Sequence, residues 1–203
     1  MLKNLFFVIC LSLSITLNAQ VQVLAFAGST RAESVNKKLV QQAANLASEL
    51  GAEVKFIDLK DYPLPIYDAD LEAQYGMPEN AKLLQNLMVN SQVILIASPE
   101  YNGSLTGLLK NTIDWVSRSP TKSASREAFQ RKKFALMSAS PGPMGGAKGL
   151  LHLQTILQDI GGIVTPQYVT VGKANQAFDE KGTLKDPKTY SALKKLIKNT
   201  IQK

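Results

Sequence analysis

Runs of consecutive apolar residues alternate along the chain with segments whose apolar positions recur every three or four residues. The uninterrupted runs occupy residues 21–27, 53–58, 92–98, 133–139 and 162–171. Because these runs are rich in Val, Ile and Leu, they predict parallel β-strands that are buried on both faces. The periodic segments occupy residues 34–50, 78–90, 106–117, 146–160 and 187–201, and they predict amphipathic helices.

Each predicted strand is followed along the chain by one predicted helix. Five such units within 203 residues predict a three-layer, doubly wound α/β domain. No repeat, low-complexity tract or linker interrupts the alternation, so we expect a single domain over residues 20–203. Ligands of such sheets bind beyond the carboxyl ends of the strands, where the winding direction reverses. The loops that follow the first, third and fourth strands are therefore the candidate site.

The first 19 residues differ from the rest of the chain. Lys3 gives a basic start, residues 5–17 are uncharged and largely apolar, and Ala19 is a small residue before a possible cleavage point. The run is short for a transmembrane span, so we predict a cleaved export signal over residues 1–19 and a periplasmic or secreted protein. An uncleaved anchor, or a cytoplasmic protein with a misassigned start codon, stays open as the alternative.

Charge and side-chain chemistry narrow the classes of function. The net charge of +7 comes largely from lysines near the C-terminus, where helical spacing indicates a solvated face rather than a nucleic-acid reader. Cys10 is the only cysteine and lies within the predicted signal, and His152 is the only histidine. This inventory disfavours a disulfide, a zinc site or a Ser-His-Asp triad, and we expect no metal. Carboxylates or a bound cofactor must then supply the chemistry.

The loop GSTRAESVN, residues 28–36, joins the first strand to its helix. A helix N-terminus carries unpaired N–H groups and a partial positive charge, which favour an anion. Ser29, Ser34, Asn36 and Arg31 add hydroxyl, amide and guanidinium donors. The fingerprints of dinucleotide sites and P-loops are absent, so the loop suits a phosphomonoester better than a pyrophosphate. The alternative is that Ser34 only caps the helix within an ordinary turn.

The other two loops suit a flat ligand. SPEYNGSLTG, residues 98–107, offers the ring of Tyr101 and the amide of Asn102, as a planar heterocycle requires. SASPGPMGGAKG, residues 138–149, contains Gly145 and Gly146, where a backbone without side chains can approach a ligand closely. Tyr101 as a packing aromatic and the glycine loop as a flexible turn are the simpler alternatives.

Together, GSTRAESVN, SPEYNGSLTGLLKNTIDWVSR and SASPGPMGGAKGLLHLQTILQDIGG resemble the motifs of the NADPH-dependent FMN reductase family, over roughly residues 21–172. The resemblance implies a flavodoxin-like, five-stranded parallel sheet in the order 2-1-3-4-5, with FMN as cofactor and NADPH or NADH as co-substrate. It implies that the FMN phosphate is held by Ser29, Arg31, Ser34 and Asn36. It implies that the isoalloxazine is lined by Pro99, Glu100, Tyr101 and Asn102, and bordered by Ser140, Gly145 and Gly146.

The resemblance also implies an oxidoreductase that reduces quinones, azo compounds, metal oxyanions or flavin by hydride transfer through flavin N5, with no catalytic side chain. Relatives form dimers or tetramers, for which Tyr101, Trp115 and the helix around His152 are candidate contacts. Lys148 stands where relatives often have arginine, and lysine cannot make the same forked contact. An electron carrier of the flavodoxin type, without NAD(P)H turnover of its own, is the main alternative, and an FMN-free binding protein is a further one.

Overall fold

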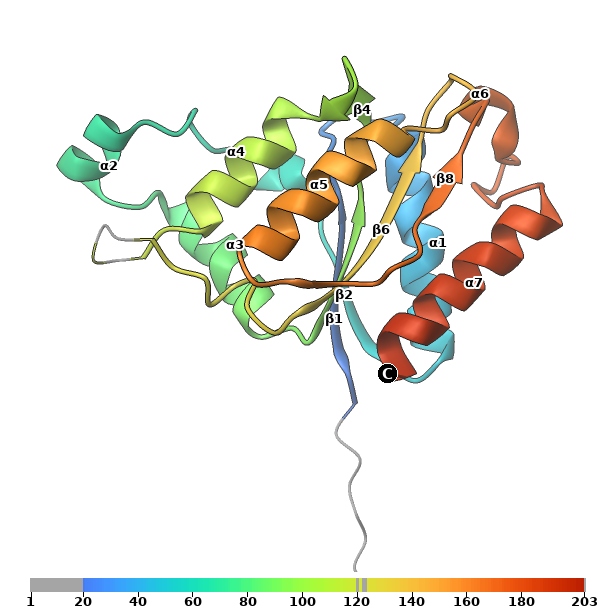
Figure 1. The fold of residues 1–203 in the computed structure, drawn as a ribbon, viewed down its shortest axis with the longest axis horizontal. Helices are drawn as coiled ribbons and strands as arrows, with labels where there is room; N and C mark the ends of the chain where they lie inside the picture. Colours follow the sequence, from blue (N-terminus) through green and yellow to red (C-terminus); the bar gives the residue numbers. More distant parts are fainter. Residues whose placement is uncertain (1–19, 120, 122–123, 203) are drawn as a thin grey trace, which may run out of the picture.

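The computed structural model describes residues 20–119, 121 and 124–202. The predicted export signal, residues 1–19, lies outside the described residues. A parallel sheet crosses the centre of the molecule (Figure 1). Its strands are β1 (Gln22–Ala27), β2 (Glu53–Phe56), β3 (Val93–Ala97), β6 (Lys133–Ala139), β7 (Ile163–Val164) and β8 (Val169–Val171).

Helices cover both faces of this sheet, as the alternating pattern predicts. One face packs against α1 (Val35–Glu49) and α7 (Pro187–Gln202), and the other against α3 (Glu79–Val89), α4 (Gly107–Val116) and α5 (Ala147–Asp159). Successive residues of a strand enter opposite cores, because side chains alternate across a strand. Val23 and Ala25 thus lie in the α1/α7 core, and Leu24 and Phe26 in the other.

The strand order is β2-β1-β3-β6-β7, with β8 also paired to β6. The predicted order 2-1-3-4-5 is confirmed, but the fifth strand is split in two rather than continuous. Phe134 of β6 faces Val164 and Met137 faces Val169, so two extra residues of the fifth strand are looped out. The interruption includes Pro166, which has no N–H to donate to a sheet ladder.

The prediction that every strand is buried on both faces is wrong for β2. Glu53, Lys55 and Phe56 are exposed, and only Val54 is half-buried. β2 lies at the edge of the sheet, where β1 is its only neighbour among the described strands. An edge strand needs fewer apolar residues because one side of it faces solvent.

Five short elements complete the described chain: η1 (Leu59–Asp61), α2 (Ala69–Tyr75), α6 (Ala174–Ala177), and the strands β4 (Glu100–Tyr101) and β5 (Ser104–Leu105), which form a hairpin. The segment just before α2 packs against α4, and this contact corrects one candidate oligomer contact. Trp115 is fully buried and donates from Nε1 to Pro65 O at 2.8 Å, with Tyr67 against its ring at 5.0 Å. Trp115 is therefore a core residue.

Buried charge holds α2 in place. Glu72 is 3% exposed, and both of its carboxylate oxygens accept from Arg118 Nε, at 2.9 and 3.0 Å. Tyr67 OH also donates to this carboxylate, at 3.0 Å. The hydrogen bond to Glu72 raises the pKa of Arg118 despite its partial burial. The pair thus fixes a segment that the apolar pattern does not predict.

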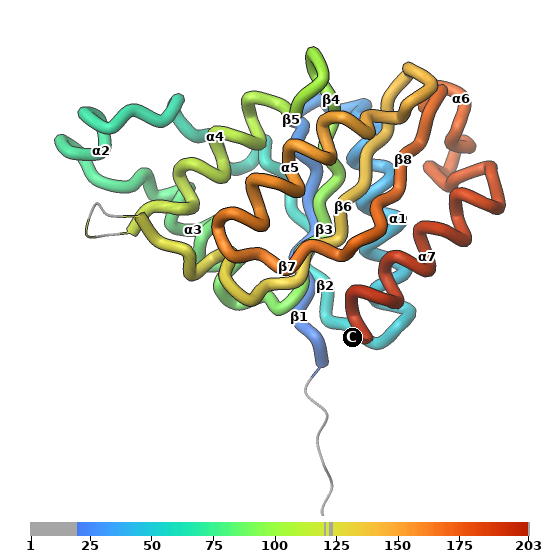
Figure 2. Tube along the Cα trace, in the orientation of Figure 1, coloured from blue at the N-terminus to red at the C-terminus, as the bar shows by residue number. Residues whose placement is uncertain are grey.

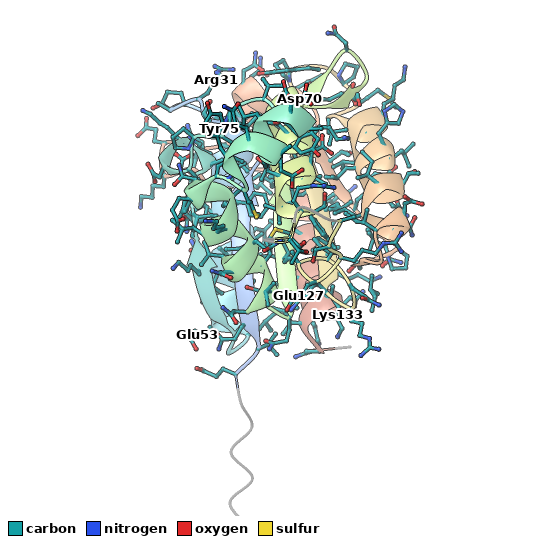
Figure 3. The ribbon with its side chains drawn as sticks, turned by 90° about the vertical axis from the view of Figure 1, so that its left-hand side faces the viewer. Arg31, Glu53, Asp70, Tyr75, Glu127 and Lys133 are labelled. Carbon is teal, nitrogen blue, oxygen red and sulfur yellow. The ribbon has the colours of Figure 1, made fainter. Side chains whose placement is uncertain are left out.

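The two ends of the sheet differ in what they present. β1 begins, and α7 ends, at the amino ends of the strands (Figure 2). The loops GSTRAESVN and PEYNG lie together at the opposite, carboxyl ends. Figure 3 places Arg31 at one end and Glu53 and Lys133 at the other. None of the helices within the described part of the chain has the length and apolar character needed to span a bilayer.

Candidate functional site

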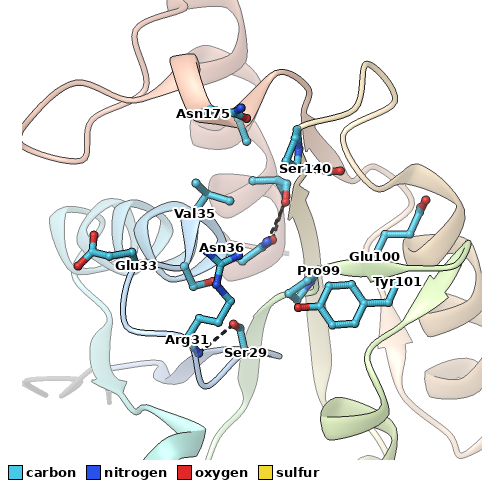
Figure 4. A pocket seen from close by; sticks show the side chains of 14 residues that line it. Ser29, Arg31, Glu33, Val35, Asn36, Pro99, Glu100, Tyr101, Ser140 and Asn175 are labelled. Atoms are coloured by element: carbon cyan, nitrogen blue, oxygen red, sulfur yellow. Dashed lines mark hydrogen bonds between the residues drawn. The ribbon is translucent and has the colours of Figure 1, made fainter.

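A cavity of about 320 Å³ opens at the carboxyl ends of β1, β3 and β6 (Figure 4). Beside it lies a hollow of about 290 Å³ that shares Glu100 and Ser140 with the cavity. The predicted residues that line the cavity are Ser29, Arg31, Ser34, Asn36, Pro99, Glu100, Tyr101 and Ser140. Gly145 and Gly146 line the hollow. The three loops therefore converge as the sequence predicts.

Gly28 starts the first loop and is fixed on both sides by hydrogen bonds. Its N–H donates to Ala97 O at 2.9 Å, and its carbonyl accepts from Thr106 Oγ1 at 2.8 Å. Thr106 is also the N-cap of α4, where its hydroxyl accepts from Leu109 N at 3.2 Å. A Cβ on Gly28 would lie 3.1 Å from Leu109 Cβ, so a larger residue would push α4 away. Glycine therefore allows this bend to pack closely against α4.

The N-terminus of α1 faces the cavity with its donors available. Ser34 is the N-cap and is buried, yet its hydroxyl makes no capping hydrogen bond, and the first turn of α1 contains no acidic residue. The simpler reading of Ser34 as a cap alone does not hold. An uncapped helix N-terminus favours an anion through its N–H groups and its dipole. Arg31 is exposed at the mouth, and among the described lining residues it is the only cation.

Asn36 lines the cavity as predicted and also has a structural role. Its Nδ2 donates to Ala139 O at 2.8 Å, and its Oδ1 accepts from Ala139 N at 2.9 Å. Both residues are buried, at 2% and 3% exposure. The amide therefore joins the first turn of α1 to the end of β6. Only the second Nδ2 hydrogen is left to face a ligand.

The neighbouring lysine is also committed within the protein. Lys37 forms an ion pair with Asp58 in the segment after β2. Burial raises the pKa of Asp58, but hydrogen bonds from Lys37 and from Lys60 N outweigh it, so the pKa lies below its usual value. The charge of Lys37 is thereby balanced, and Arg31 supplies the positive charge at the cavity.

The second loop forms the β4–β5 hairpin on the opposite side of the cavity from Arg31 (Figure 4). Asn102 and Gly103 occupy its tip with φ of 53° and 78°, the left-handed pair that a tight hairpin turn needs. Asn102 is exposed and lines neither the cavity nor the hollow, unlike its predicted place beside a ring. Tyr101 is 56% exposed and lies at the cavity wall.

The third loop owes its shape to two glycines with positive φ. Gly145 has φ of 61°, and a Cβ there would lie 2.8 Å from the backbone of Val171. Gly146 has φ of 91°, and a Cβ there would lie 2.0 Å from Ser138 Oγ. Neither position accommodates a side chain. At these two positions the wall of the hollow is therefore bare backbone.

Thr106 and Asn175 are among the contributors that sequence reasoning missed. Thr106 joins the first loop to α4, and Asn175 of α6 lines the cavity from the loop after β8. The rule that ligands meet the carboxyl ends of strands applies to the fifth strand as well as to the others, and would have pointed to Asn175. His152 lies outside the cavity, where Nδ1 is 3.1 Å from Ser104 Oγ. Within the described residues, no group of three His, Cys, Asp or Glu side chains is arranged to hold a metal.

These features define a class of protein. A parallel sheet with helices on both faces, a free helix N-terminus at one end of the cavity and bare backbone at the other form a flavodoxin-like mononucleotide site. The chain belongs to the NADPH-dependent FMN reductase family, whose model matches residues 21–176. It is therefore an NAD(P)H-dependent oxidoreductase with FMN as its cofactor, which confirms the enzyme over the electron carrier.

Individual relatives agree with this assignment. The chain is 33% identical over 184 residues to an NAD(P)H-dependent FMN reductase of Pseudomonas aeruginosa, covering 90% of this chain and 92% of the relative. It is 32% identical to an NADPH:quinone oxidoreductase of Arabidopsis thaliana, covering 87% and 88% of the two chains. A solved flavoenzyme NAD(P)H:(acceptor) oxidoreductase of Paracoccus denitrificans shares the fold with a TM-score of 0.73 and 28% identity, over 90% and 96% of the chains.

Proposed function

We propose that the chain reduces small planar acceptors, quinones foremost, with FMN held across the cavity and its neighbouring hollow. The observation that carries the proposal is the N-terminus of α1, whose first-turn N–H groups face the cavity. The buried hydroxyl of its N-cap, Ser34, also faces the cavity and makes no capping hydrogen bond. A phosphate is the group that such a terminus receives best.

The phosphate end involves three side chains. Ser29 and Ser34 are buried at the cavity wall, and Arg31 approaches from the exposed rim (Figure 4). Ser29 Oγ accepts from Arg31 N at 3.3 Å, which holds the loop in a tight turn and leaves its hydroxyl proton for a ligand oxygen. The guanidinium supplies a fork matched to phosphate oxygens.

The ring end is formed by the hairpin and the glycine loop. Pro99 is buried, Tyr101 is exposed at the wall, and Gly145 and Gly146 present backbone without side chains. Backbone N–H groups at this edge would stabilise negative charge on a bound ring. Bound FMN supplies the hydride acceptor and donor, so the chain itself needs to bind and orient rather than to provide an acid or base.

The open side of the cavity indicates which class of electron acceptor the chain can reduce. Hydride transfer requires the donor and then the acceptor to stack closely on the same ring, so a flat molecule is favoured. The relatives named as quinone oxidoreductases support quinones. A solved azoreductase of Bacillus anthracis shares the fold at 18% identity, with a TM-score of 0.61.

Replacement of Arg31 by Ala tests the phosphate end. We expect FMN to bind about tenfold more weakly, because one charge-assisted contact is lost, with a smaller loss for riboflavin, which has no phosphate. Arg126→Ala is the matched control, since this exposed arginine does not line the cavity. Equal FMN affinity in both variants would refute the assignment of the phosphate end.

We also propose export and self-association. β1 begins at the end of the sheet opposite the loops that line the cavity (Figure 2), so cleavage before residue 20 would remove none of the residues that line the cavity. Fractionation of the native host, with mass determination of the mature chain, tests cleavage after Ala19. For a homodimer or homotetramer, the exposed Tyr101, Met144 and Leu151 near the hairpin and α5 support an apolar contact surface. Sedimentation of the purified protein tests the oligomer.

A further inference from the structure

Glu100 carries an inference that rests on the proposed function and deepens it. Sequence reasoning places this residue beside the flavin ring, but its carboxylate has a partner inside the protein. Glu100 Oε2 accepts from Gly149 N at 2.8 Å. Gly149 is the third residue of α5, and its N–H is one of those that a helix leaves unpaired at its start.

α5 has no side chain of its own that caps its N-terminus. Its N-cap is Gly146, which has φ of 91° and makes no side-chain capping bond. A serine or aspartate, the usual caps, is excluded there because a Cβ would lie 2.0 Å from the buried Ser138 Oγ. The shape of the glycine loop thus prevents α5 from being capped locally.

The hairpin supplies the missing cap. We infer that Glu100 is a positioning residue that caps α5 from the hairpin and thereby fixes the distance between the two walls of the flavin ring site. Glu100 lines both the cavity and the hollow, so its bond to α5 lies where the two walls meet. In Figure 4 its carboxylate is turned away from Arg31, on the side of the cavity formed by the hairpin.

Close packing makes the distance between these walls sensitive to small changes. A Cβ on Gly149 would lie 3.0 Å from Ser104 O and 3.3 Å from Glu100 Cβ, so the hairpin rests directly on the backbone of α5. One turn later, His152 Nδ1 lies 3.1 Å from Ser104 Oγ and provides a second tether. Loss of the cap would leave only this exposed contact as a side-chain tether.

Four variants separate the effect of the length of the Glu100 side chain from the effect of its charge. Glu100→Gln keeps an acceptor oxygen at the same reach without the charge, whereas Glu100→Asp keeps the charge on a side chain one methylene shorter. Glu100→Ala removes both, and Gly149→Ala keeps the carboxylate of Glu100 but presses a Cβ against Ser104 O and Glu100 Cβ. Glu180→Gln is the control, since it removes an exposed carboxylate away from the cavity.

The first measurement uses the FMN-free protein and needs no flavin. Hydrogen exchange at the Gly149 amide, followed by NMR, reports the cap directly. We expect exchange to accelerate about tenfold or more in Glu100→Ala and Glu100→Asp, and to stay near wild type in Glu100→Gln and Glu180→Gln. Unchanged exchange in Glu100→Ala would overturn the cap even if FMN binds as proposed.

The second measurement is FMN affinity by fluorescence titration. We expect binding to weaken about tenfold in Glu100→Ala, Glu100→Asp and Gly149→Ala, and to be restored by Glu100→Gln. If Glu100→Gln binds FMN as wild type and Glu100→Asp does not, the length of the side chain rather than its charge is responsible for FMN affinity. If the Ala and Asp variants lose the cap yet bind FMN as wild type, the positioning role is refuted. If wild type binds no FMN, the proposed function fails instead.

Discussion

Asn36→Ala is the perturbation that best separates a structural from a ligand-binding role in the first loop. The substitution removes the donor and the acceptor that pair with Ala139 at 2.8 and 2.9 Å. Ala139 is 3% exposed and ends β6, so its N–H and carbonyl would both be left without partners in a buried place. The cost falls on the FMN-free protein as well as on the complex.

The magnitude follows from the two orphaned groups. Each of the two buried backbone groups that loses its partner costs about 1–3 kcal/mol, so we expect a loss of about 2–6 kcal/mol. A domain of this size has a total stability of about 5–15 kcal/mol, so the variant should unfold at markedly lower denaturant. The melting temperature should fall by about 4–24 °C, at roughly 2–4 °C per kcal/mol.

Urea unfolding of the FMN-free protein, followed by circular dichroism, measures this loss. Asn175→Ala is the matched control, because Asn175 lines the same cavity but is exposed, and its loss should stay within about 0.5 kcal/mol. If Asn36 served only a phosphate, Asn36→Ala would weaken FMN binding and leave the free protein as stable as wild type. That result would refute the clamp on Ala139.

Three further outcomes follow from other parts of the fold. Gly146→Ala should cost more than about 2 kcal/mol in urea unfolding and weaken FMN binding, because the added Cβ meets Ser138 Oγ at 2.0 Å; wild-type behaviour would contradict the bare-backbone wall. Glu72→Ala should cost about 3–5 kcal/mol by the same assay, since it leaves Arg118 partly buried without its carboxylate. Hydrogen bonds from the Thr189 hydroxyl and N–H hold the pKa of Asp186 below 3.8, so the stability it gives is present above that pH and lost as the pH falls through the lowered value. Asp186→Asn should therefore show a shallower loss of stability in acid unfolding below about pH 4, and an unchanged acid profile would contradict this.

The apolar pattern predicts the main elements well because burial is what it records. α1 spans Val35–Glu49 where residues 34–50 were expected, and β6 spans Lys133–Ala139 as predicted. The failures have physical causes as well. Strand β2 is exposed, although we expected it to be buried. The prediction failed because the apolar pattern does not reveal which strand lies at the edge of the sheet. α2 is held by Glu72 and Arg118, a polar contact that periodicity does not record.

In the candidate site, too, some features are predictable from the sequence and others are not. Residue types and motif order predict which loops meet, because the carboxyl ends of parallel strands share one edge. They do not predict where each polar group is directed. Asn36 bonds to a residue 103 positions later in the chain, and Glu100 bonds to one 49 positions later. Both look like ligand contacts in the sequence, and both are engaged within the fold.

Side chains that bond within the protein explain how a cavity formed by short loops keeps its shape. Ser29, Ser34 and Arg31 offer donors to the cavity, whereas Asn36, Thr106 and Glu100 tie the three loops to one another. Each tie joins a side chain to backbone of another segment, so no loop can move without breaking a buried or half-buried bond. Ordering loops on binding would subtract from affinity, and ties made beforehand remove that cost. A loop that binds mostly through hydroxyls and N–H groups therefore depends on the side-chain bonds that join it to the other two loops.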